Sequence, residues 1–354
     1  MPAAFIADLR ARISAASAAR TPLRLRGGGT KDFYGGPLRG EVVEMGGYGG
    51  IVAYEPRELV LTVRAGTALS EVEATLAAER QMLPFEPPHF PGGKATIGGT
   101  VAAGLSGPRR PYAGAVRDFV LGARIVNGKG EDLSFGGRVI KNVAGYDVSR
   151  LMAGALGTLG AITEVSFKVL PRPSAEITLS QQVDEAQATR RVNAWAGQPL
   201  PITATAWFAG RLLVRLAGAE SAVRAARAKI GGEEAADLPD FWLALRDHRI
   251  AFFAGDAPVW RVSVPQTTPP MELGATPLVE WGGGLRWLRG DLDAAKVRSE
   301  AARAGGHATL FRGGDKSSGV FQPLAPPMLK VHKRLKEAFD PAGILNPGRM
   351  YGEL

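Results

Sequence analysis

Glycine is concentrated in one part of this 354-residue chain, and this uneven distribution limits the fold more than any other feature. More than half of the 46 glycines lie in residues 27–160. Glycine permits backbone conformations and close approaches that a Cβ atom would prevent, so this stretch is typical of tight turns or of a backbone lying against a ligand. Pro171-Arg172-Pro173 ends the stretch and predicts a domain boundary. The length is sufficient for two domains of about 150 residues each.

The composition excludes several classes of protein. Cysteine is absent, which excludes disulfides, thiolate-bound clusters, cysteine nucleophiles and a cysteinyl cofactor link. The net charge is +9, but the basic residues are spread along the chain and aromatic residues make up only 7%, which argues against a nucleic-acid platform. No stretch approaches the roughly 18 apolar residues of a membrane span, so we expect a soluble, cytoplasmic protein.

The apolar periodicity of the first half predicts short strands with few helices. Strands are expected at 59–64, 120–126 and 163–169, and a short amphipathic helix is expected at the N-terminus. Because strands outnumber helices without strict alternation, the pattern favours an α+β fold over a doubly wound nucleotide-binding fold.

The second half has a different pattern, in which two helices alternate with the strands of a small antiparallel sheet, as in a ferredoxin-like arrangement. Strands are expected at 202–208, 212–216, 259–264, 278–281, 285–288 and 307–311, and helices at 219–230 and 291–304. A basic amphipathic helix is expected over 328–339, with Met328, Val331, Leu335 and Phe339 facing inward.

Three glycine-rich segments are candidate ligand loops. In Arg26-Gly-Gly-Gly-Thr-Lys31, successive backbone N–H groups can converge on anionic oxygens; a flexible surface turn is the alternative. The spacing fits neither a P-loop nor a dinucleotide fingerprint. Small residues fill 91–107, which predicts a short helix with a bare surface for a flat ring, or else tight helix packing. A third run, 154–163, leads directly into a strand.

The order and spacing of these segments resemble the PCMH-type FAD-binding domain of the vanillyl-alcohol-oxidase family. Residues 112–122, Lys141–Asp147 and the closing Asn346-Pro-Gly-Arg349 resemble its further motifs, although a simple turn is an equal interpretation of Lys141-Asn142. Glu86-Pro-Pro, residues 107–111, Trp281-Gly-Gly and residues 305–309 extend the resemblance to the FAD-binding E subunits of bacterial glycolate oxidase (glycolate dehydrogenase) over essentially the whole chain.

The resemblance implies a two-lobed FAD-binding domain at 1–172, a smaller ferredoxin-like α+β cap domain at 173–325, and a helix and tail at 326–354 that return to the FAD site. It also implies a complex with a larger FAD-containing subunit and an iron–sulfur subunit, oxidising glycolate to glyoxylate, with this chain relaying electrons or supporting the assembly. Any membrane association is expected only through that complex. The alternative is a stand-alone FAD-dependent oxidoreductase acting on a small hydroxy acid or sugar derivative.

The resemblance further implies which residues bind the cofactor. The candidate FAD-binding residues are Gly27, Gly28, Gly29, Thr30, Lys31, Thr96, Gly98, Gly99, Ser106, Gly107, Gly157, Gly160, Ile162, Asn346 and Arg349. Some relatives tether the flavin through His or Cys, but here His89 is the only nearby candidate. We therefore expect non-covalent FAD, with His89 hydrogen bonded in its proline-rich loop.

Catalytic residues are harder to assign. Oxidation of a 2-hydroxy acid requires a cation for the carboxylate and a base for the hydroxyl proton. Related dehydrogenases carry an HxGDGNxH run that binds a metal, and this sequence lacks it, so no metal site is predicted and the larger partner is the better candidate for substrate oxidation. If this chain contributes, the candidates are His307, Arg261 and Arg286; a structural role for His307 and a solvated sheet face for Arg261 are the favoured alternatives.

Overall fold

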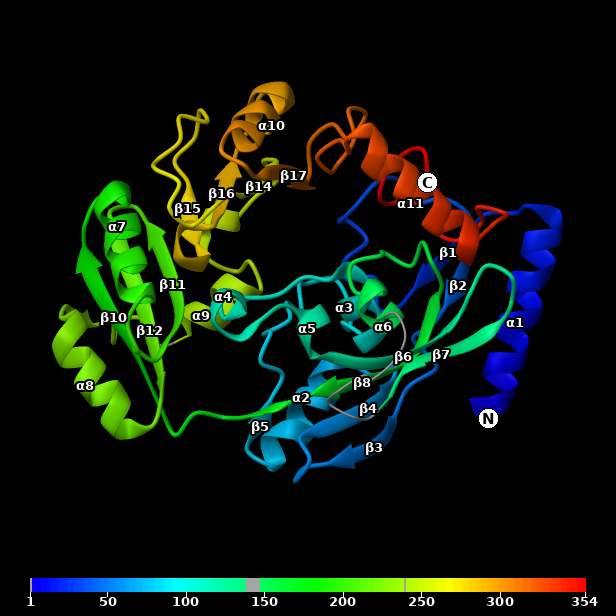
Figure 1. Cartoon of the computed structure of the whole chain (residues 1–354), viewed down its shortest axis with the longest axis horizontal. Coiled ribbons are helices and arrows are strands. Elements are labelled where there is room, and N and C mark those ends of the chain that lie inside the picture. Colours follow the sequence, from blue (N-terminus) through cyan, green and yellow to red (C-terminus); the bar gives the residue numbers. More distant parts are fainter. Residues whose placement is uncertain (1, 138–146, 239) are drawn as a thin grey trace.

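The computed structural model describes residues 2–137, 147–238 and 240–354, which form an α+β structure (Figure 1). The elements of the first half are α1 (Pro2–Ala19), β1 (Leu23–Arg26), β2 (Glu41–Glu44), β3 (Ile51–Glu55), β4 (Val60–Arg64), α2 (Leu69–Ala78), β5 (Gln81–Met82), α3 (Ile97–Ala103), α4 (Arg110–Ala113), α5 (Val116–Phe119), β6 (Val120–Val126), β7 (Asp132–Gly136), α6 (Val148–Leu151), β8 (Ala161–Lys168) and β9 (Leu170–Pro171).

The second half contains one large sheet and the helices that cover it. Its elements are β10 (Ala175–Gln182), α7 (Glu185–Ala196), β11 (Ile202–Phe208), β12 (Arg211–Gly218), α8 (Glu220–Ile230), β13 (Glu233–Glu234), α9 (Phe241–Arg246), η1 (Ala251–Phe253), β14 (Val259–Ser263), β15 (Leu278–Glu280), η2 (Trp281–Gly283), β16 (Leu285–Arg289), α10 (Ala294–Arg303), β17 (His307–Arg312) and α11 (Pro326–Phe339).

The first half has two lobes. In the smaller lobe, the parallel pair β1–β2 packs against α1, whose Leu9 and Ile13 are buried. In the larger lobe, an antiparallel sheet of order β3-β4-β8-β6-β7 shares a core with α2 and α3. The glycine-rich loop that follows β1 therefore lies where the two lobes meet.

The cap sheet has the strand order β13-β10-β12-β11-β15-β16-β14-β17, and its pairing is antiparallel throughout. Each group of four strands follows the 4-1-3-2 order of a ferredoxin-like unit, and the two units join at β11–β15. The ferredoxin-like prediction is thus confirmed, but the sheet is twice the expected size because two units pair edge to edge. Helices α7, α8 and α10 cover one face; the other face packs toward the first half (Figure 1).

The predicted strands agree with the structure within about two residues at each end. Strands β11 and β12 are buried on both faces, so the apolar runs between turn residues are what located them. The tail helix differs from expectation. Leu335 and Phe339 pack against the core of the larger lobe, but Met328 and Val331 are exposed. The first turns of α11 extend beyond that lobe, so they have no core to cover.

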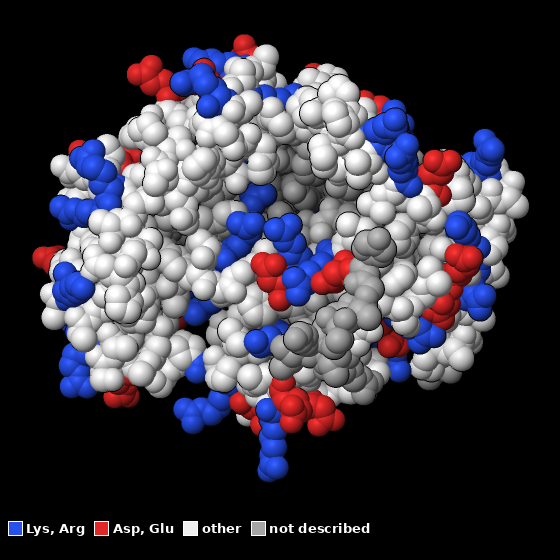
Figure 2. Space-filling view, viewed as in Figure 1, with Lys and Arg blue, Asp and Glu red and all other residues white. Residues whose placement is uncertain are grey.

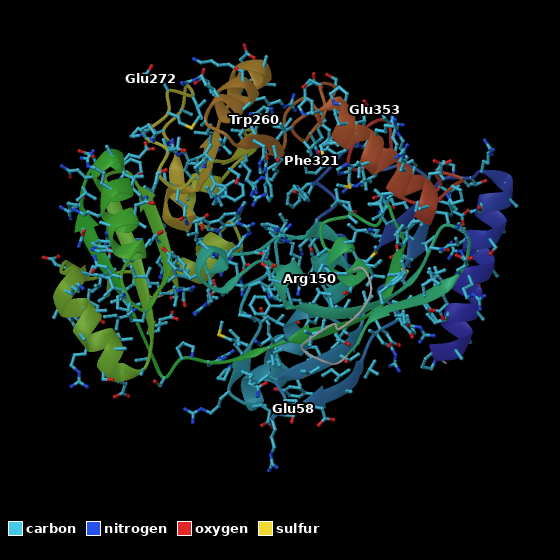
Figure 3. All side chains as sticks on the ribbon, viewed as in Figure 1. Glu58, Arg150, Trp260, Glu272, Phe321 and Glu353 are labelled. Carbon is cyan, nitrogen blue, oxygen red and sulfur yellow. The ribbon has the colours of Figure 1, made fainter. Side chains whose placement is uncertain are left out.

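The sheets divide along the chain at about Pro173, where the first sheet ends and the large sheet begins. The tail returns to the smaller lobe, where Leu345 bridges to Leu23 of β1. The division into domains at 1–172, 173–325 and 326–354 stays a prediction. In Figure 3, Phe321 lies between the cap strands and α11, where its ring packs against Tyr34 and Tyr351.

Candidate functional site

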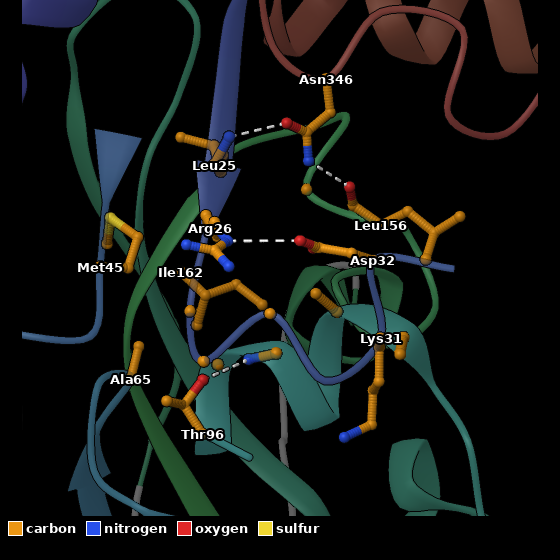
Figure 4. Close-up of a pocket in the computed structure, with 18 of the residues that line it drawn as sticks. Leu25, Arg26, Lys31, Asp32, Met45, Ala65, Thr96, Leu156, Ile162 and Asn346 are labelled. Carbon is orange, nitrogen blue, oxygen red and sulfur yellow. Dashed lines mark hydrogen bonds and ion pairs between the residues drawn. The ribbon is translucent and has the colours of Figure 1, made fainter. Parts of the chain in front are cut away.

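A pocket lies between the two lobes of the first half (Figure 4). Small-molecule and cofactor sites occur preferentially at such junctions. The candidate FAD-binding residues that line it are Gly27, Gly28, Gly29, Thr30, Lys31, Thr96, Gly98, Gly99, Gly157, Gly160, Ile162, Asn346 and Arg349. The tertiary structure thus brings together residues from segments that are more than 300 positions apart.

The loop after β1 presents a row of free hydrogen-bond donors. Within the described residues, none of the five backbone N–H groups of residues 27–31 donates to an acceptor in the protein. Unpaired amides at the wall of a pocket require an acceptor from a ligand or from water. Successive amides of this kind form a concave site for anionic oxygens, so the loop fits the pyrophosphate of FAD.

Two glycines of this loop are required by packing. A Cβ at Gly27 would lie 2.3 Å from Thr96 Oγ1, and a Cβ at Gly28 would lie 1.5 Å from the carbonyl oxygen of Lys94. The loop can therefore approach the segment before α3 only without side chains. A Gly28→Asp variant would distort the loop itself. A loss of FAD binding in this variant would therefore not show whether a negative charge repels the pyrophosphate.

Helix α3 presents the bare surface expected from its small residues. Gly98, Gly99, Ala102 and Ala103 line the pocket, whereas Ile97 and Val101 point into the core of the larger lobe. The Thr96 side chain caps the helix and accepts from the Gly99 amide at 3.3 Å. Sequence reasoning missed Ala102, although its position three residues after Gly99 on the same helix face is the signal that could have found it.

Ser106 and Gly107 lie outside this pocket. Ser106 Oγ accepts from the amide of Val116 at 3.1 Å, and the Gly107 carbonyl accepts from Trp281 Nε1 at 3.1 Å. Both residues line a second pocket beneath the cap. The chain leaves α3 through Gly104, which has φ +66°, and this turn directs residues 105–107 toward the cap.

Asn346 fastens the tail to both sides of the pocket. Its Oδ1 accepts from the amide of Leu25 at 2.8 Å, and its Nδ2 donates to the carbonyl of Leu156 at 2.6 Å (Figure 4). A Cβ at Gly157 would lie 2.6 Å from Asn346 Nδ2, so the glycine is what lets the amide approach. Asn346 and Leu156 both have positive φ, and such strained positions are enriched at ligand sites.

Arg349 holds the loop that follows the glycines. Its guanidinium donates to the backbone carbonyls of Tyr34 and Gly36 and, at 3.4 Å, to that of Asp32. Burial lowers the pKa of Arg349 to about 10, but the group stays charged at neutral pH. Arg349 therefore stabilises the loop and adds positive charge to the pocket wall.

Two further cations lie at the pocket. Arg26 is neutralised by Asp32 and Glu44, at 3.3 Å each. Lys31, which extends away from Arg26 in Figure 4, forms no ion pair among the described residues, and burial lowers its pKa to about 8. An anion bound nearby would stabilise the ammonium form of Lys31.

His89 does not line the pocket. Its Nε2 lies 2.8 Å from Glu73 Oε2, and its amide donates to Asp247 Oδ1 at 3.0 Å. His89 is therefore hydrogen bonded in its loop, as the sequence predicts. The candidate motif Lys141–Asp147 lies almost entirely in 138–146, outside the described residues.

The three candidate catalytic residues do not lie together. Arg261 and His307 share one face of the cap sheet, because Arg261 pairs with Thr309 and Ser263 pairs with His307. Arg286 pairs with Val262 and points to the opposite face, where it donates to the carbonyls of Pro269 and Thr268. Arg286 is 1% exposed, so its guanidinium is used to hold a loop.

The favoured interpretation places Arg261 on a solvated sheet face, and the structure differs from it. Arg261 lines the second pocket, together with Glu280, which sequence reasoning did not select. The cap sheet packs against the first half of the molecule. The polar face of β14, which contains Arg261, is therefore covered by the neighbouring lobe.

Comparisons with known proteins agree with this geometry. Residues 3–136 match the FAD binding domain family model, and residues 313–350 match the C-terminal domain of FAD linked oxidases. The chain is 48% identical to glycolate oxidase subunit GlcE of Escherichia coli (strain K12), over 97% of this chain and 96% of that protein. This chain belongs to the GlcE family.

More distant relatives match the GlcE-family chain over shorter stretches. Glycolate oxidase subunit GlcD of Bacillus subtilis (strain 168) is 32% identical over 48% of this chain and 37% of its own length. A solved structure of alkyldihydroxyacetonephosphate synthase superposes with a TM-score of 0.65 at 17% identity, covering 96% of this chain and 74% of that one, which shows a shared fold.

The family assignment confirms the predicted FAD-linked oxidoreductase class and the PCMH-type fold. Among the described residues, no group of three or more His, Cys, Asp or Glu side chains is placed to bind a metal ion. In the same part of the chain, no helix has the length and apolar character needed to cross a membrane.

Proposed function

We propose that this chain is the FAD-binding subunit of a cytoplasmic glycolate oxidase complex that converts glycolate to glyoxylate. Its partners would be a larger FAD-containing subunit and an iron–sulfur subunit, and any membrane contact would be made through them. The observation that carries the cofactor assignment is the row of five unpaired amides at residues 27–31 on the pocket wall. The 48% identity to a glycolate oxidase subunit supports the choice of complex.

The residues of this chain would bind and orient the cofactor. The glycine loop would hold the pyrophosphate of FAD, and the bare face of α3 would lie along the flat part of the cofactor. Asn346 would keep the two walls of the pocket together. Bound FAD supplies a flavin ring that carries electrons between donor and acceptor.

FAD is expected to be bound without a covalent link. Cysteine is absent, and His89 is held by Glu73 outside the pocket. Precipitation of the purified chain with acid should therefore release all of the yellow colour into the supernatant. Colour that stays with the washed pellet would contradict a non-covalent site.

A larger side chain at Gly99 is expected to displace FAD without unfolding the protein. A Cβ at Gly99 meets only Thr96 Oγ1, at 3.2 Å, so the side-chain direction opens into the pocket. Gly99→Leu should weaken FAD binding at least tenfold, measured by flavin absorbance after gel filtration. The matched control is Gly47→Leu, since nothing lies within 4 Å of a Cβ there. Equal flavin retention in both variants would place the cofactor elsewhere.

The role in the complex is tested by reconstitution. We expect the isolated chain to show no dye-linked glycolate oxidation, and the larger flavoprotein plus the iron–sulfur subunit to regain activity only when this chain is added. Full activity of the other two subunits without this chain would contradict the proposed role. Rapid anaerobic bleaching of the flavin in this chain alone would assign glycolate oxidation to this subunit.

A further inference from the structure

Lys316 lies in the segment that joins β17 of the cap to α11, and its ammonium contacts the chain that continues from the glycine loop at 27–31. Lys316 Nζ donates to the carbonyl of Phe33 at 2.5 Å and to the carbonyl of Gly35 at 3.0 Å. A residue 283 positions further along the chain than Phe33 therefore holds the backbone next to the cofactor loop.

Arg349 contacts the alternate carbonyls of the same stretch. Its guanidinium donates to the carbonyls of Tyr34 and Gly36, so each of the four consecutive carbonyls of residues 33–36 accepts from one of two cations. Hydrogen bonds from charged donors of this kind are stronger than those between neutral groups. The chain thus presents its unpaired amides to the pocket and its next carbonyls to Lys316 and Arg349.

The cap determines where Lys316 lies. After β17 the chain turns through residues 313–314, two glycines that both have φ +68°, a conformation that favours glycine. Arg298 of α10 donates to the carbonyls at 318–319, at 3.1 and 2.6 Å. Residues 313–319, which we call the bridging segment, are therefore fastened to the cap by Arg298 and to the cofactor loop by Lys316.

The charge of Lys316 is directed to these carbonyls alone. Among the described residues its ammonium forms no ion pair, and the adjacent Asp315 accepts instead from the amide and the hydroxyl of Ser317, at 2.8 and 2.6 Å. Burial, together with the nearby charge of Arg349, lowers the pKa of Lys316. The position is therefore unfavourable for a cation, and the carbonyls of the cofactor loop offset this cost.

The basic residues of the neighbouring helix behave differently. Lys and Arg side chains project at the surface over α11 in Figure 2, and Lys330, Lys333 and Arg334 of this helix are exposed. Lys316 is half-buried, and its ammonium is turned toward the first half of the molecule. Solubility explains an exposed lysine, but it does not explain one that is held against two backbone carbonyls.

Apolar packing alone does not fix this part of the backbone. The rings of Phe33 and Tyr34 pack against Phe311 of β17, with ring centroids 5.5 and 5.2 Å apart. These contacts hold the side chains to the cap, but they supply no donor to a carbonyl. Because buried carbonyls require donors, the two cations are what determine the path of the backbone through 33–36.

We propose that Lys316 is a positioning residue for FAD, which acts with Arg349 to hold the carbonyls of 33–36 so that the amides of 27–31 face the cofactor before it binds. A loop that is already ordered loses less conformational entropy on binding, so the affinity is higher. The cap thereby contributes to the FAD site, although Lys316 does not line the pocket. By linkage, bound FAD should stabilise the contact between the bridging segment and the loop. This inference rests on the proposed function in taking FAD as the ligand.

The experiment titrates the full chain, depleted of flavin, with FAD and measures the dissociation constant by the change in flavin fluorescence. Lys316→Met should weaken FAD binding by about tenfold, and Lys316→Arg should restore most of the affinity, because a guanidinium can donate to the same carbonyls. Arg312→Met is the matched control: it removes a donor to a carbonyl inside the cap, that of Phe253, and should leave FAD affinity unchanged. The flavin-free Lys316→Met chain should melt no lower than flavin-free Arg312→Met.

The outcomes separate this proposal from the proposed function. A loss of FAD affinity in Lys316→Met that Lys316→Arg restores supports the positioning role. Equal affinity in Lys316→Met and the parent chain, or an equal loss in Arg312→Met, overturns it while leaving FAD as the cofactor. A loss that Lys316→Arg does not restore, with a lower melting temperature of the flavin-free chain, also overturns it, because Lys316 would then support only the fold. A parent chain that does not bind FAD would overturn the proposed function itself.

Discussion

Replacement of Lys336 by methionine is expected to destabilise the protein by about 3–5 kcal/mol, the range for breaking a buried ion pair. The Lys336 ammonium uses all three donors: it donates to Asp340 Oδ2 at 2.7 Å and to the carbonyls of Thr158 and Leu345 at 2.8 Å. Asp340 is 1% exposed, so the variant leaves a carboxylate buried without its counter-ion.

The same change should reduce FAD retention, because Thr158 lies in the turn between Gly157 and Gly160 on the pocket wall. Chemical unfolding gives the stability, and flavin absorbance after gel filtration gives the occupancy. Lys333→Met is the control, since Lys333 is exposed on the same helix and its loss should cost less than about 0.5 kcal/mol. The double change Lys336→Met with Asp340→Asn should recover part of the loss. Equal stability of the Lys336 and Lys333 variants would show that the buried pair contributes nothing.

Replacement of Glu280 by glutamine is expected to stabilise the protein above neutral pH by about 3 kcal/mol. Burial raises the pKa of Glu280 from 4.5 to about 7, against the opposing effects of Trp287 and Arg261 and with that of Glu86. The folded state therefore binds this proton more tightly than the unfolded state does. Below about pH 4.5 both states are protonated and the residue costs nothing; as the pH rises toward 7, ionisation of the unfolded state progressively destabilises the fold.

The difference between Glu280→Gln and the parent chain should thus be small at pH 5 and reach its full size at pH 8. Glutamine keeps a side-chain oxygen that can accept from Trp287 Nε1, so packing should change little. Urea unfolding at both pH values, in a buffer without carboxylates, provides the measurement. A difference that does not change with pH would mean that Glu280 ionises in the folded state as an exposed carboxyl does.

The family and the glycine loops could be recognised from the sequence because the relevant signals are local. Each motif carries its own turn chemistry, and strands such as 120–126 and 202–208 are short apolar runs bounded by turn residues. The tail motif ending in Asn346 and Arg349 was also recognisable as a site motif, although its partners were not. Its hydrogen bonds to Leu25, Leu156 and Tyr34 join residues that are far apart in the sequence.

The α+β class, the change of pattern near Pro173 and the glycine segments of the cofactor pocket could be recognised from the amino-acid sequence, because turn chemistry and apolar runs are properties of a few neighbouring residues. The packing of distant segments instead places Arg261 and Glu280 at a pocket, turns Arg286 away from it, and leaves Met328 and Val331 exposed. The physical reason is that a strand or helix pattern gives two faces but does not say what covers each one. That choice depends on how the cap sheet and the tail pack against lobes that are distant in the chain.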